Sequence, residues 1–231
     1  MYEIVIGRSE SDKKKLGLKG TIFLGKHYVK MGAVTSLSNQ VYIDVAQPHV
    51  ILLTGKRGSG KSHTLAVIAE EMSKLPEGIR ERIGVLIFDT MGIFWTAKYP
   101  NTKDEDLLTE WRIKPESFDV TIYTPEGYFE EQKNNGIPVD KSFTINPTEL
   151  TAEEWCNVFN VNIFDPIGIT IERALESLEG KDYDIRNIIN QIMEDDSISE
   201  DIKLATENRF KAAKQWRIFN KESTPDRKSV V

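Results

Sequence analysis

The sequence predicts an α/β fold with a mostly parallel sheet, preceded by a small N-terminal β-barrel and carrying a helical insertion. Short apolar runs broken by glycines fill the first 46 residues, apolar β-branched runs flank a helical pattern in the middle of the chain, and helical patterns dominate residues 151–220. We therefore expect a barrel-like domain over residues 1–46 and an α/β core over residues 47–231, whose helical segment covers about residues 151–220.

The predicted barrel consists of short strands. Four runs have strand character, and glycines and an expected turn at Ser36–Asn39 separate them. These runs are Glu3–Gly7, Thr21–Leu24, His27–Met31 and Val41–Val45. Short, evenly spaced strands predict a small barrel or a curled sheet ahead of the core.

The predicted core begins with a strand, a glycine-rich loop and a helix. His49–Thr54 is a short apolar run rich in β-branched residues, as expected of a buried parallel strand, and Thr64–Met72 has apolar residues at helical spacing. A second buried strand is predicted over Ile83–Asp89, and further strands over Asp119–Tyr123 and Lys141–Ile145. Together these strands would form the mostly parallel sheet.

The helical segment carries its own start signals. Thr151–Glu154 reads as a capping box, and Asp165–Pro166 as an N-cap followed by a proline at the first helical position. Two more helices are predicted over Asp184–Met193 and Ser199–Phe219. The residues of the last helix expected to share one face, as core or as a subunit contact, are Ala205, Ala212, Trp216 and Phe219.

The composition is that of an ordinary globular protein. The 231 residues are 39% hydrophobic and 29% charged. No apolar run approaches the roughly 20 residues of a membrane span, and Met1–Gly7 reads as a strand rather than a signal peptide. The single cysteine, Cys156, excludes an internal disulfide. These features predict a cytoplasmic protein that does not insert in a membrane.

The charge is segregated along the chain. The net charge of −6 argues against a uniformly basic nucleic-acid-binding protein, yet residues 1–32 carry +4 and residues 202–231 carry +5. Acidic residues dominate between Glu149 and Asp201. The basic segments permit local contact with a polyanion, and solvated faces explain them equally well.

The glycine-rich loop carries the most specific signal. Gly55–Ser62 fits G-x-x-x-x-G-K-[ST] and lies between the predicted strand and helix, which is the context that a P-loop requires. Its backbone N–H groups and the helix N-terminus would bind phosphates, Lys61 would reach the β- and γ-phosphates as the catalytic lysine, and Ser62 would ligate Mg²⁺. The ligands are therefore predicted to be ATP and Mg²⁺. The candidate nucleotide-binding residues are Gly55, Lys56, Arg57, Gly58, Ser59, Gly60, Lys61, Ser62 and His63.

Asp89 is a second candidate ligand of Mg²⁺. It ends an apolar run, as the aspartate of a Walker B strand does. However, Asp89 is followed by Thr90, where ATPases that activate water usually have glutamate. The strand that ends in Asp89 is also the first after the P-loop helix, and in many ATPase sheets that strand does not lie beside the P-loop strand. The acidic run Glu194–Asp196 follows a helical pattern and reads as a helix end. No other apolar strand ends in Asp-Glu.

The chain resembles the HerA/FtsK class of ATPases, and HerA-like proteins in particular. The resemblance is carried by His49–Ser62 and by Val85–Trp95, which is similar to the family's strand ending in Asp-x-x-Gly followed by an aromatic position. Gly20–Gly25 fits the small barrel that precedes the ATPase domain in this family. The resemblance covers most of residues 1–125 and implies a RecA/FtsK-like P-loop ATPase. It further implies a DNA-translocating, helicase-type enzyme that forms a hexameric ring, with a nuclease or another effector as partner in DNA processing or antiphage defence.

In this family the Walker B Asp-Glu and the arginine finger lie beyond the helical insertion. We therefore expect a chain truncated before the Walker B motif, with only part of the ATPase core. Whether this chain can hydrolyse ATP by itself is left open. Ile93 occupies the position after Asp-x-x-Gly where the family usually has glutamate.

Two other functions are compatible with the sequence. A regulatory or scaffold module that binds a nucleotide without turnover would need no Asp-Glu strand. A P-loop small-molecule kinase would need a lid rich in arginine, and no such segment stands out. A GTPase is disfavoured, because Asn220–Ser223 lacks the aspartate of Asn-Lys-x-Asp.

Overall fold

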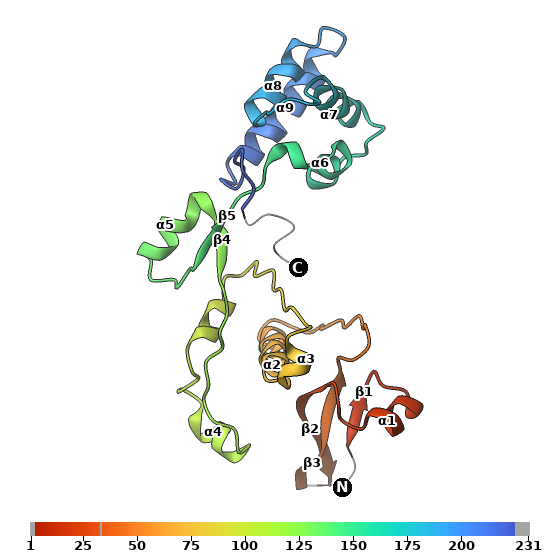
Figure 1. Ribbon diagram of the computed structural model, residues 1–231, viewed down its shortest axis with the longest axis vertical. Coiled ribbons are helices and arrows are strands. Elements are labelled where there is room, and N and C mark those ends of the chain that lie inside the picture. The colour runs from red at the N-terminus through yellow and green to blue at the C-terminus, as the bar shows by residue number, and fades with distance from the viewer. Residues whose placement is uncertain (1–2, 33, 225–231) are drawn as a thin grey trace. The chain divides into compact units, whose positions relative to one another are not determined.

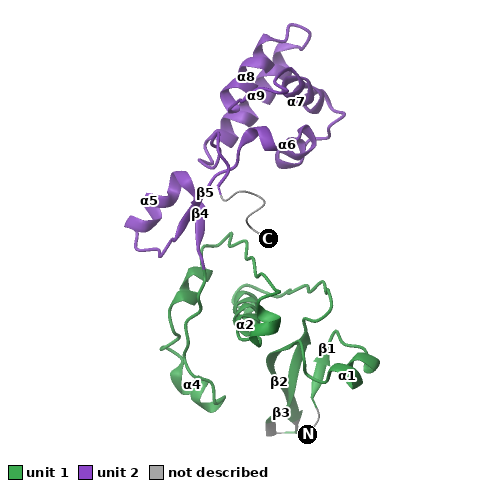
Figure 2. Cartoon of the chain, in the orientation of Figure 1, with its two compact units in different colours: residues 1–120 green, residues 121–231 purple. Residues whose placement is uncertain are grey.

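The computed structural model describes residues 3–32 and 34–224 and divides into two compact units, Met1–Val120 and Thr121–Val231 (Figure 2). We call them unit 1 and unit 2 and describe each by itself. Both combine helices with strands, so the mixed α/β class expected from the sequence is confirmed. None of the helices within the described residues is long and apolar enough to cross a bilayer.

Unit 1 begins with a three-stranded sheet of spatial order β1-β3-β2 (Figure 1). β1 (Ile4–Ile6) runs parallel to β3 (Val34–Asp44), and β3 pairs antiparallel with β2 (Thr21–Met31). Pairing begins at Thr21 with Asp44 and shifts register at a bulge near Gly25. The sheet occupies the segment for which a barrel was expected, and the closed barrel itself stays a prediction.

Two expectations about these strands were wrong in detail. The runs Thr21–Leu24 and His27–Met31 belong to one continuous strand, and Ser36–Asn39, expected as a turn, lies inside β3. The long β2–β3 ladder explains both differences. It pairs Leu37 with Tyr28 and Ser36 with Val29, so cross-strand hydrogen bonding overrides the turn preference of small polar residues.

Helix α2 (Lys61–Ser73) packs against this sheet. Its side chains Ile68 and Met72 lie on a small core formed by Ile22, Ile43 and Leu75, of which none is more than 6% exposed. The sheet thereby supports the helix whose N-terminus follows the glycine-rich loop. The other short helices of unit 1 are α1 (Glu10–Leu16), α3 (Glu77–Arg80), the 3₁₀-helix η1 (Phe94–Lys98) and α4 (Glu105–Glu110).

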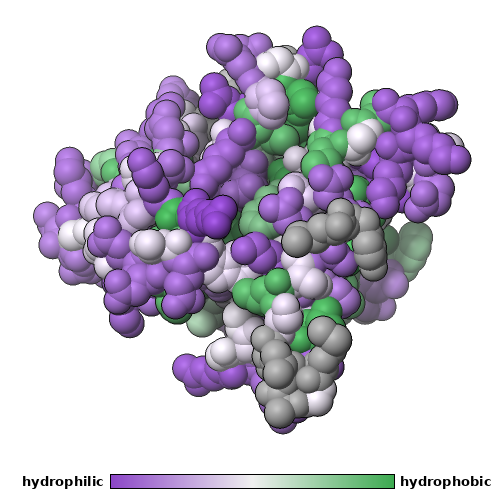
Figure 3. All heavy atoms as spheres, turned by 90° about the horizontal axis from the view of Figure 1, so that it is seen from below, coloured by the Kyte–Doolittle hydropathy of each residue, from purple (hydrophilic) through white to green (hydrophobic). Residues whose placement is uncertain are grey.

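The two central strands expected from the sequence are absent from the described residues. Neither His49–Thr54 nor Ile83–Asp89 is hydrogen-bonded into a sheet, and Leu52 and Phe88 are 84% and 85% exposed. A strand forms only where a neighbouring segment completes its backbone hydrogen bonds, and no described segment pairs with these two. Apolar surface shows between the charged side chains in the space-filling view (Figure 3).

Unit 2 opens with a small βαβ arrangement. β4 (Tyr123–Pro125) and β5 (Lys141–Phe143) pair in parallel, and α5 (Glu126–Asn134) connects them. The strand expected over Asp119–Tyr123 is therefore displaced to the C-terminal side. The 3₁₀-helix η2 (Pro147–Glu149) leads into four helices, which are α6 (Ala152–Phe159), α7 (Pro166–Ser177), α8 (Ile185–Glu194) and α9 (Glu200–Lys214).

Trp155 is at the centre of the core of unit 2. Its ring is fully buried and packs against Phe210 and Phe159 with centroid distances of 5.0 and 5.5 Å. Ile171 and Ile188 are also fully buried, so α6, α7, α8 and α9 all contribute to one core. Aromatic packing of this kind stabilises beyond simple burial of area.

The expected face of the last helix was wrong. α9 ends at Lys214, before Trp216 and Phe219, and Ala212 is exposed. The residues of α9 that are buried are Lys203, Thr206, Phe210 and Ala213. Two of these are polar, which concealed the face in the sequence. Burial is tolerated because the Thr206 hydroxyl donates to the Ile202 carbonyl at 2.8 Å and the Lys203 ammonium to the Met193 carbonyl at 2.9 Å.

The predicted capping box of α6 is confirmed. The Thr151 hydroxyl accepts from the Glu154 N–H at 3.2 Å, and the Glu154 carboxylate accepts from the Thr151 N–H at 2.8 Å. We expect Thr151→Ala to lower the stability of unit 2 by about 1 kcal/mol, because a helix N–H loses its acceptor. Amide hydrogen exchange of α6 would measure the change, and Thr151→Ser should retain wild-type protection. Equal exchange in the alanine variant would contradict the prediction.

Candidate nucleotide-binding site

The loop from Gly55 to Gly60 is turned by two glycines in the left-handed region. Gly58 has φ +78° and Gly60 has φ +87°, conformations that are strained for residues with a side chain. Between them, the Ser59 N–H donates to the Lys56 carbonyl at 3.1 Å and closes a tight turn. The loop is exposed along its whole length. The glycines therefore shape an open turn that leads directly into α2.

The N-terminus of α2 presents backbone donors. The first helical hydrogen bond runs from the Thr64 N–H to the Gly60 carbonyl at 2.8 Å, so the N–H groups of Lys61, Ser62 and His63 have no acceptor within the helix. No acidic residue lies in the first turn. Three free N–H groups at the positive end of a helix dipole favour an anion.

Lys61 lies back over the loop. Its ammonium donates to the carbonyl oxygens of Gly55 and Lys56, both at 2.8 Å. These two contacts hold the charge beside the turn and leave the ammonium a third N–H to donate. A phosphate oxygen would be a stronger, charge-assisted acceptor than either carbonyl.

The remaining loop cations are exposed. Within the described residues, the side chains of Lys56, Arg57 and His63 form no hydrogen bond or ion pair. They flank the loop without contributing to its folded geometry. Ser62, the second residue of α2, is exposed as well, so its hydroxyl is accessible from solvent. All nine predicted nucleotide-binding residues therefore lie in one loop and the first turn of one helix.

The Asp89 carboxylate accepts hydrogen bonds from three backbone N–H groups. The donors are the N–H groups of Met91 at 3.2 Å, Ile93 at 2.7 Å and Phe94 at 2.7 Å. In the described chain no hydrogen bond or ion pair joins Asp89 to the glycine loop. The side chain thus organises the turn before η1, and its role as a Mg²⁺ ligand stays a prediction.

We expect Asp89→Ala to release this turn. The N–H groups of Ile93 and Phe94 lose their acceptor, at a local cost of about 1 to 2 kcal/mol, so both amides should exchange faster with solvent. The comparison with Asp89→Asn, which keeps an acceptor oxygen, isolates that contact. A raised Mg²⁺ requirement for nucleotide binding in both variants, with unchanged exchange, would instead support the metal-ligand role.

The donor groups of the site fit a phosphate chain better than a free metal ion. Phosphate oxygens need N–H groups and an ammonium, and the loop and α2 supply both. Among the described residues, no cluster of three or more His, Cys, Asp or Glu side chains offers a metal site by itself. Mg²⁺ commonly takes substrate phosphates as ligands beside one or two protein groups, so the Ser62 hydroxyl fits it only together with a nucleotide.

The sequence pattern did not reveal a buried cluster just before the loop. Asp44, at the end of β3, is paired with Arg8 and also lies 3.2 Å from the His49 imidazole. Both side chains of the ion pair are buried, at 0% exposure for Arg8 and 1% for Asp44. Residues 36 apart in sequence give no periodic signal, so only the fold brings them together.

A comparison with known families identifies the chain. The family described as "Helicase HerA, central domain" matches residues 29–228, which include the glycine loop, Asp89 and helices α5 to α9 of unit 2. No curated protein and no solved structure matched. The family match covers most of the chain and agrees with the P-loop geometry described above. The chain therefore belongs to the HerA central-domain family and is a P-loop ATPase of the HerA/FtsK type.

Proposed function

We propose that this chain is the ATP-binding part of a HerA-like DNA-translocating ATPase. The observation that carries the proposal is the start of α2, where three free N–H groups and the Lys61 ammonium surround an exposed glycine turn. Membership of the HerA central-domain family supports it. DNA translocation and helicase activity are inferred from that family.

In the proposed complex each site residue has a distinct role. The backbone of Gly55–Gly60 surrounds the phosphates, and Lys61 exchanges its two carbonyl partners for phosphate oxygens. The Ser62 hydroxyl would hold Mg²⁺, which would neutralise phosphate charge. Lys56, Arg57 and His63 add positive charge at the rim of the loop.

We also propose the wider setting that the family implies. The chain would act in a hexameric ring in the cytoplasm, with a nuclease or another effector protein, in DNA processing or antiphage defence. The barrel-like domain over residues 1–46 and the ATPase core over residues 47–231 remain the proposed domains. The segregated positive charge of residues 1–32 and 202–231 supports contact with DNA.

The test measures ATP binding by the purified chain, and ATP hydrolysis and assembly of the full-length protein. We expect Mg²⁺-dependent ATP binding, a hydrolysis rate that rises with added DNA, and nucleotide-dependent assembly seen by sedimentation. GTP is a suitable competitor control for base preference. A monomer with nucleotide bound, whose ATPase rate ignores DNA, would overturn the DNA-motor proposal.

A nucleotide-binding module without turnover is the second candidate function. The observation in its favour is the engagement of Asp89 by three backbone N–H groups, which leaves no free carboxylate beside the loop in the contacts described. Tight ATP binding without phosphate release would select it. Transfer of phosphate to a metabolite, unaffected by DNA, would select the third candidate, a P-loop small-molecule kinase.

A further inference from the structure

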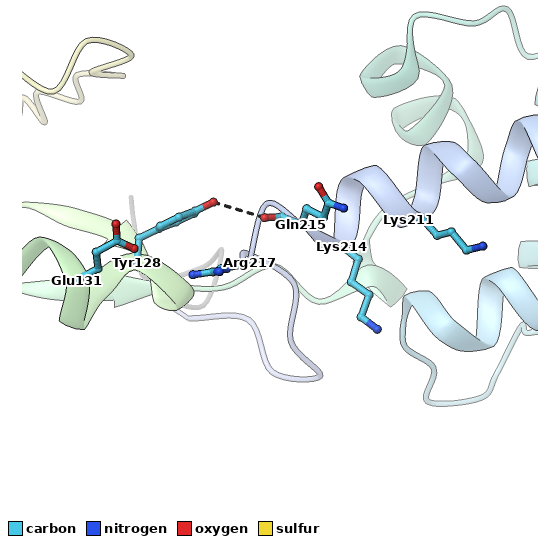
Figure 4. A pocket seen from close by; sticks show the side chains of 6 residues that line it. All are labelled: Tyr128, Glu131, Lys211, Lys214, Gln215 and Arg217. Atoms are coloured by element: carbon cyan, nitrogen blue, oxygen red, sulfur yellow. Dashed lines mark hydrogen bonds between the residues drawn. The ribbon is translucent and has the colours of Figure 1, made fainter.

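A cationic pocket lies in unit 2, away from the glycine loop in sequence. It is an open surface pocket of about 780 Å³ between α5 and the end of α9 (Figure 4). The residues that line it are Tyr128, Glu131, Lys211, Lys214, Gln215 and Arg217. Three of the six are cations and one is acidic, so the pocket favours an anionic ligand.

Arg217 is held in place by its backbone and by an aromatic ring. Its φ of +54° is a left-handed conformation that costs a residue with a side chain free energy. The Gly127 N–H donates to the Arg217 carbonyl at 3.1 Å, and a Cβ at Gly127 would collide with the Arg217 side chain. The guanidinium lies 5.3 Å from the Tyr128 ring centroid. A strained residue fixed in this way is a marker of functional sites.

Two lysines of α9 complete the positive charge. Lys211 and Lys214 are one turn apart and both line the pocket, although the Lys211 side chain in Figure 4 points away from Tyr128 and Arg217. Lys211 is paired with Glu207 at 2.7 Å, whereas Lys214 has no ion pair within the described residues. Basic residues in a last turn also stabilise a helix through its dipole, which is the simpler explanation for both lysines. That explanation does not extend to Arg217, which lies beyond the end of α9.

The arrangement matches the chemistry of a phosphodiester chain. One nitrogen of the Arg217 guanidinium donates to the Gly127 carbonyl at 3.5 Å, and its remaining N–H groups can donate to phosphate oxygens. Flexible lysine ammoniums can contact neighbouring phosphates. Positive charge is also concentrated in this part of the sequence, because residues 202–231 carry +5 although the whole chain carries −6. We propose that this pocket, formed by Tyr128, Lys214 and Arg217 with Lys211, binds the phosphodiester backbone of a DNA strand. The proposal rests on the proposed DNA-translocating function and locates one DNA contact.

The first test removes one charge from the pocket. In the full chain, Lys214→Gln should weaken binding of a fluorescent single-stranded oligonucleotide about five- to eightfold at 0.1 M salt. The slope of log affinity against log salt should fall by about 0.7 to 0.9, as for one lost phosphate contact. Lys181→Gln, an exposed lysine whose ammonium donates only to the Ser177 carbonyl, is the matched control and should leave both quantities unchanged.

The second test separates binding from folding. Arg217→Gly removes the guanidinium but adopts φ +54° without strain, so we expect weaker DNA binding with an unchanged melting temperature. Wild-type affinity in both pocket variants, with wild-type DNA binding intact, would overturn this site and leave the DNA-motor proposal standing. Absence of DNA binding by the wild-type chain would overturn both. A loss of ATP binding rather than DNA binding in Lys214→Gln would assign the pocket to a free nucleotide and contradict the proposal.

Discussion

Lys61→Ala should lower the affinity for ATP by about 10- to 150-fold, which corresponds to the roughly 1.5 to 3 kcal/mol of a hydrogen bond to a charged group. The loop would lose the cation that now bridges the carbonyls of Gly55 and Lys56. The free N–H groups at the start of α2 would remain, so residual binding is expected. Titration calorimetry with ATP and Mg²⁺ would measure the difference.

Two controls make this result specific. Lys56→Ala removes an exposed charge from the same loop and should cost far less affinity, since the Lys56 side chain forms no hydrogen bond or ion pair within the described residues. Lys61→Arg keeps the charge but changes the geometry of the donors, and we expect it to rescue little binding. Equal affinity losses in Lys56→Ala and Lys61→Ala would mean that the overall charge of the loop, rather than the placement of Lys61, binds the phosphates.

The glycine loop is the part of the site that the sequence predicts well. Glycine at positions 58 and 60 permits the left-handed backbone of the turn, and residues 65–72 are rich in good helix formers. The capping box at Thr151 is predictable for the same reason. These features depend on residues within a few positions of one another.

Features that depend on distant partners were not predictable in the same way. The segments His49–Thr54 and Ile83–Asp89 have the composition of buried strands, but composition does not supply the neighbour that a strand must pair with. In the folded chain the Asp89 carboxylate accepts hydrogen bonds from the N–H groups of Ile93 and Phe94, although its position after an apolar run indicated a metal ligand. A motif therefore identifies a chemical group without identifying its partners.

The pocket at the end of α9 was only partly predictable from the sequence. The excess of positive charge after Ile202 was visible in the sequence. The contact between Arg217 and Tyr128 was not, because 89 residues separate them and the helix was expected to continue to Phe219. Charge patterning thus indicated the region, and the early end of α9 determined which cation reaches the ring.

Arg8→Ala should destabilise unit 1 by about 3 to 5 kcal/mol, because it leaves the buried Asp44 carboxylate without its cation. The guanidinium also donates to the carbonyls of Gly17 at 2.7 Å and Lys19 at 2.8 Å, which would lose their donor. Hydrogen exchange of the β3 amides in the full chain measures unit 1 separately from unit 2. Lys14→Ala, an exposed lysine on α1, is the control and should change little.

The same cluster predicts how the stability of unit 1 depends on pH. Burial raises the pKa of Asp44, but hydrogen bonds from Arg8, His49 and the Ala46 N–H outweigh it, so the pKa of Asp44 is lowered overall. Its stabilising contribution is therefore complete above the unfolded value of about 3.9 and is lost as pH falls through the lower folded pKa. Asp44→Asn should remove this part of the acid dependence, and an unchanged acid profile in that variant would contradict the assignment.

A double variant tests whether the pair acts as a unit. Replacing Arg8 and Asp44 together by apolar residues removes both buried charges, so the combined loss should be smaller than the sum of the two single losses, by about 0.5 to 3 kcal/mol. The hydrogen bond from the His49 imidazole to the Asp44 carboxylate connects the end of the sheet to the segment that leads into Gly55. If that link positions the loop, Arg8→Ala should also weaken ATP binding under conditions where unit 1 remains folded. Unchanged ATP affinity there would limit the cluster to a stabilising role, because the loop would then keep its geometry through Gly58, Gly60 and α2 alone.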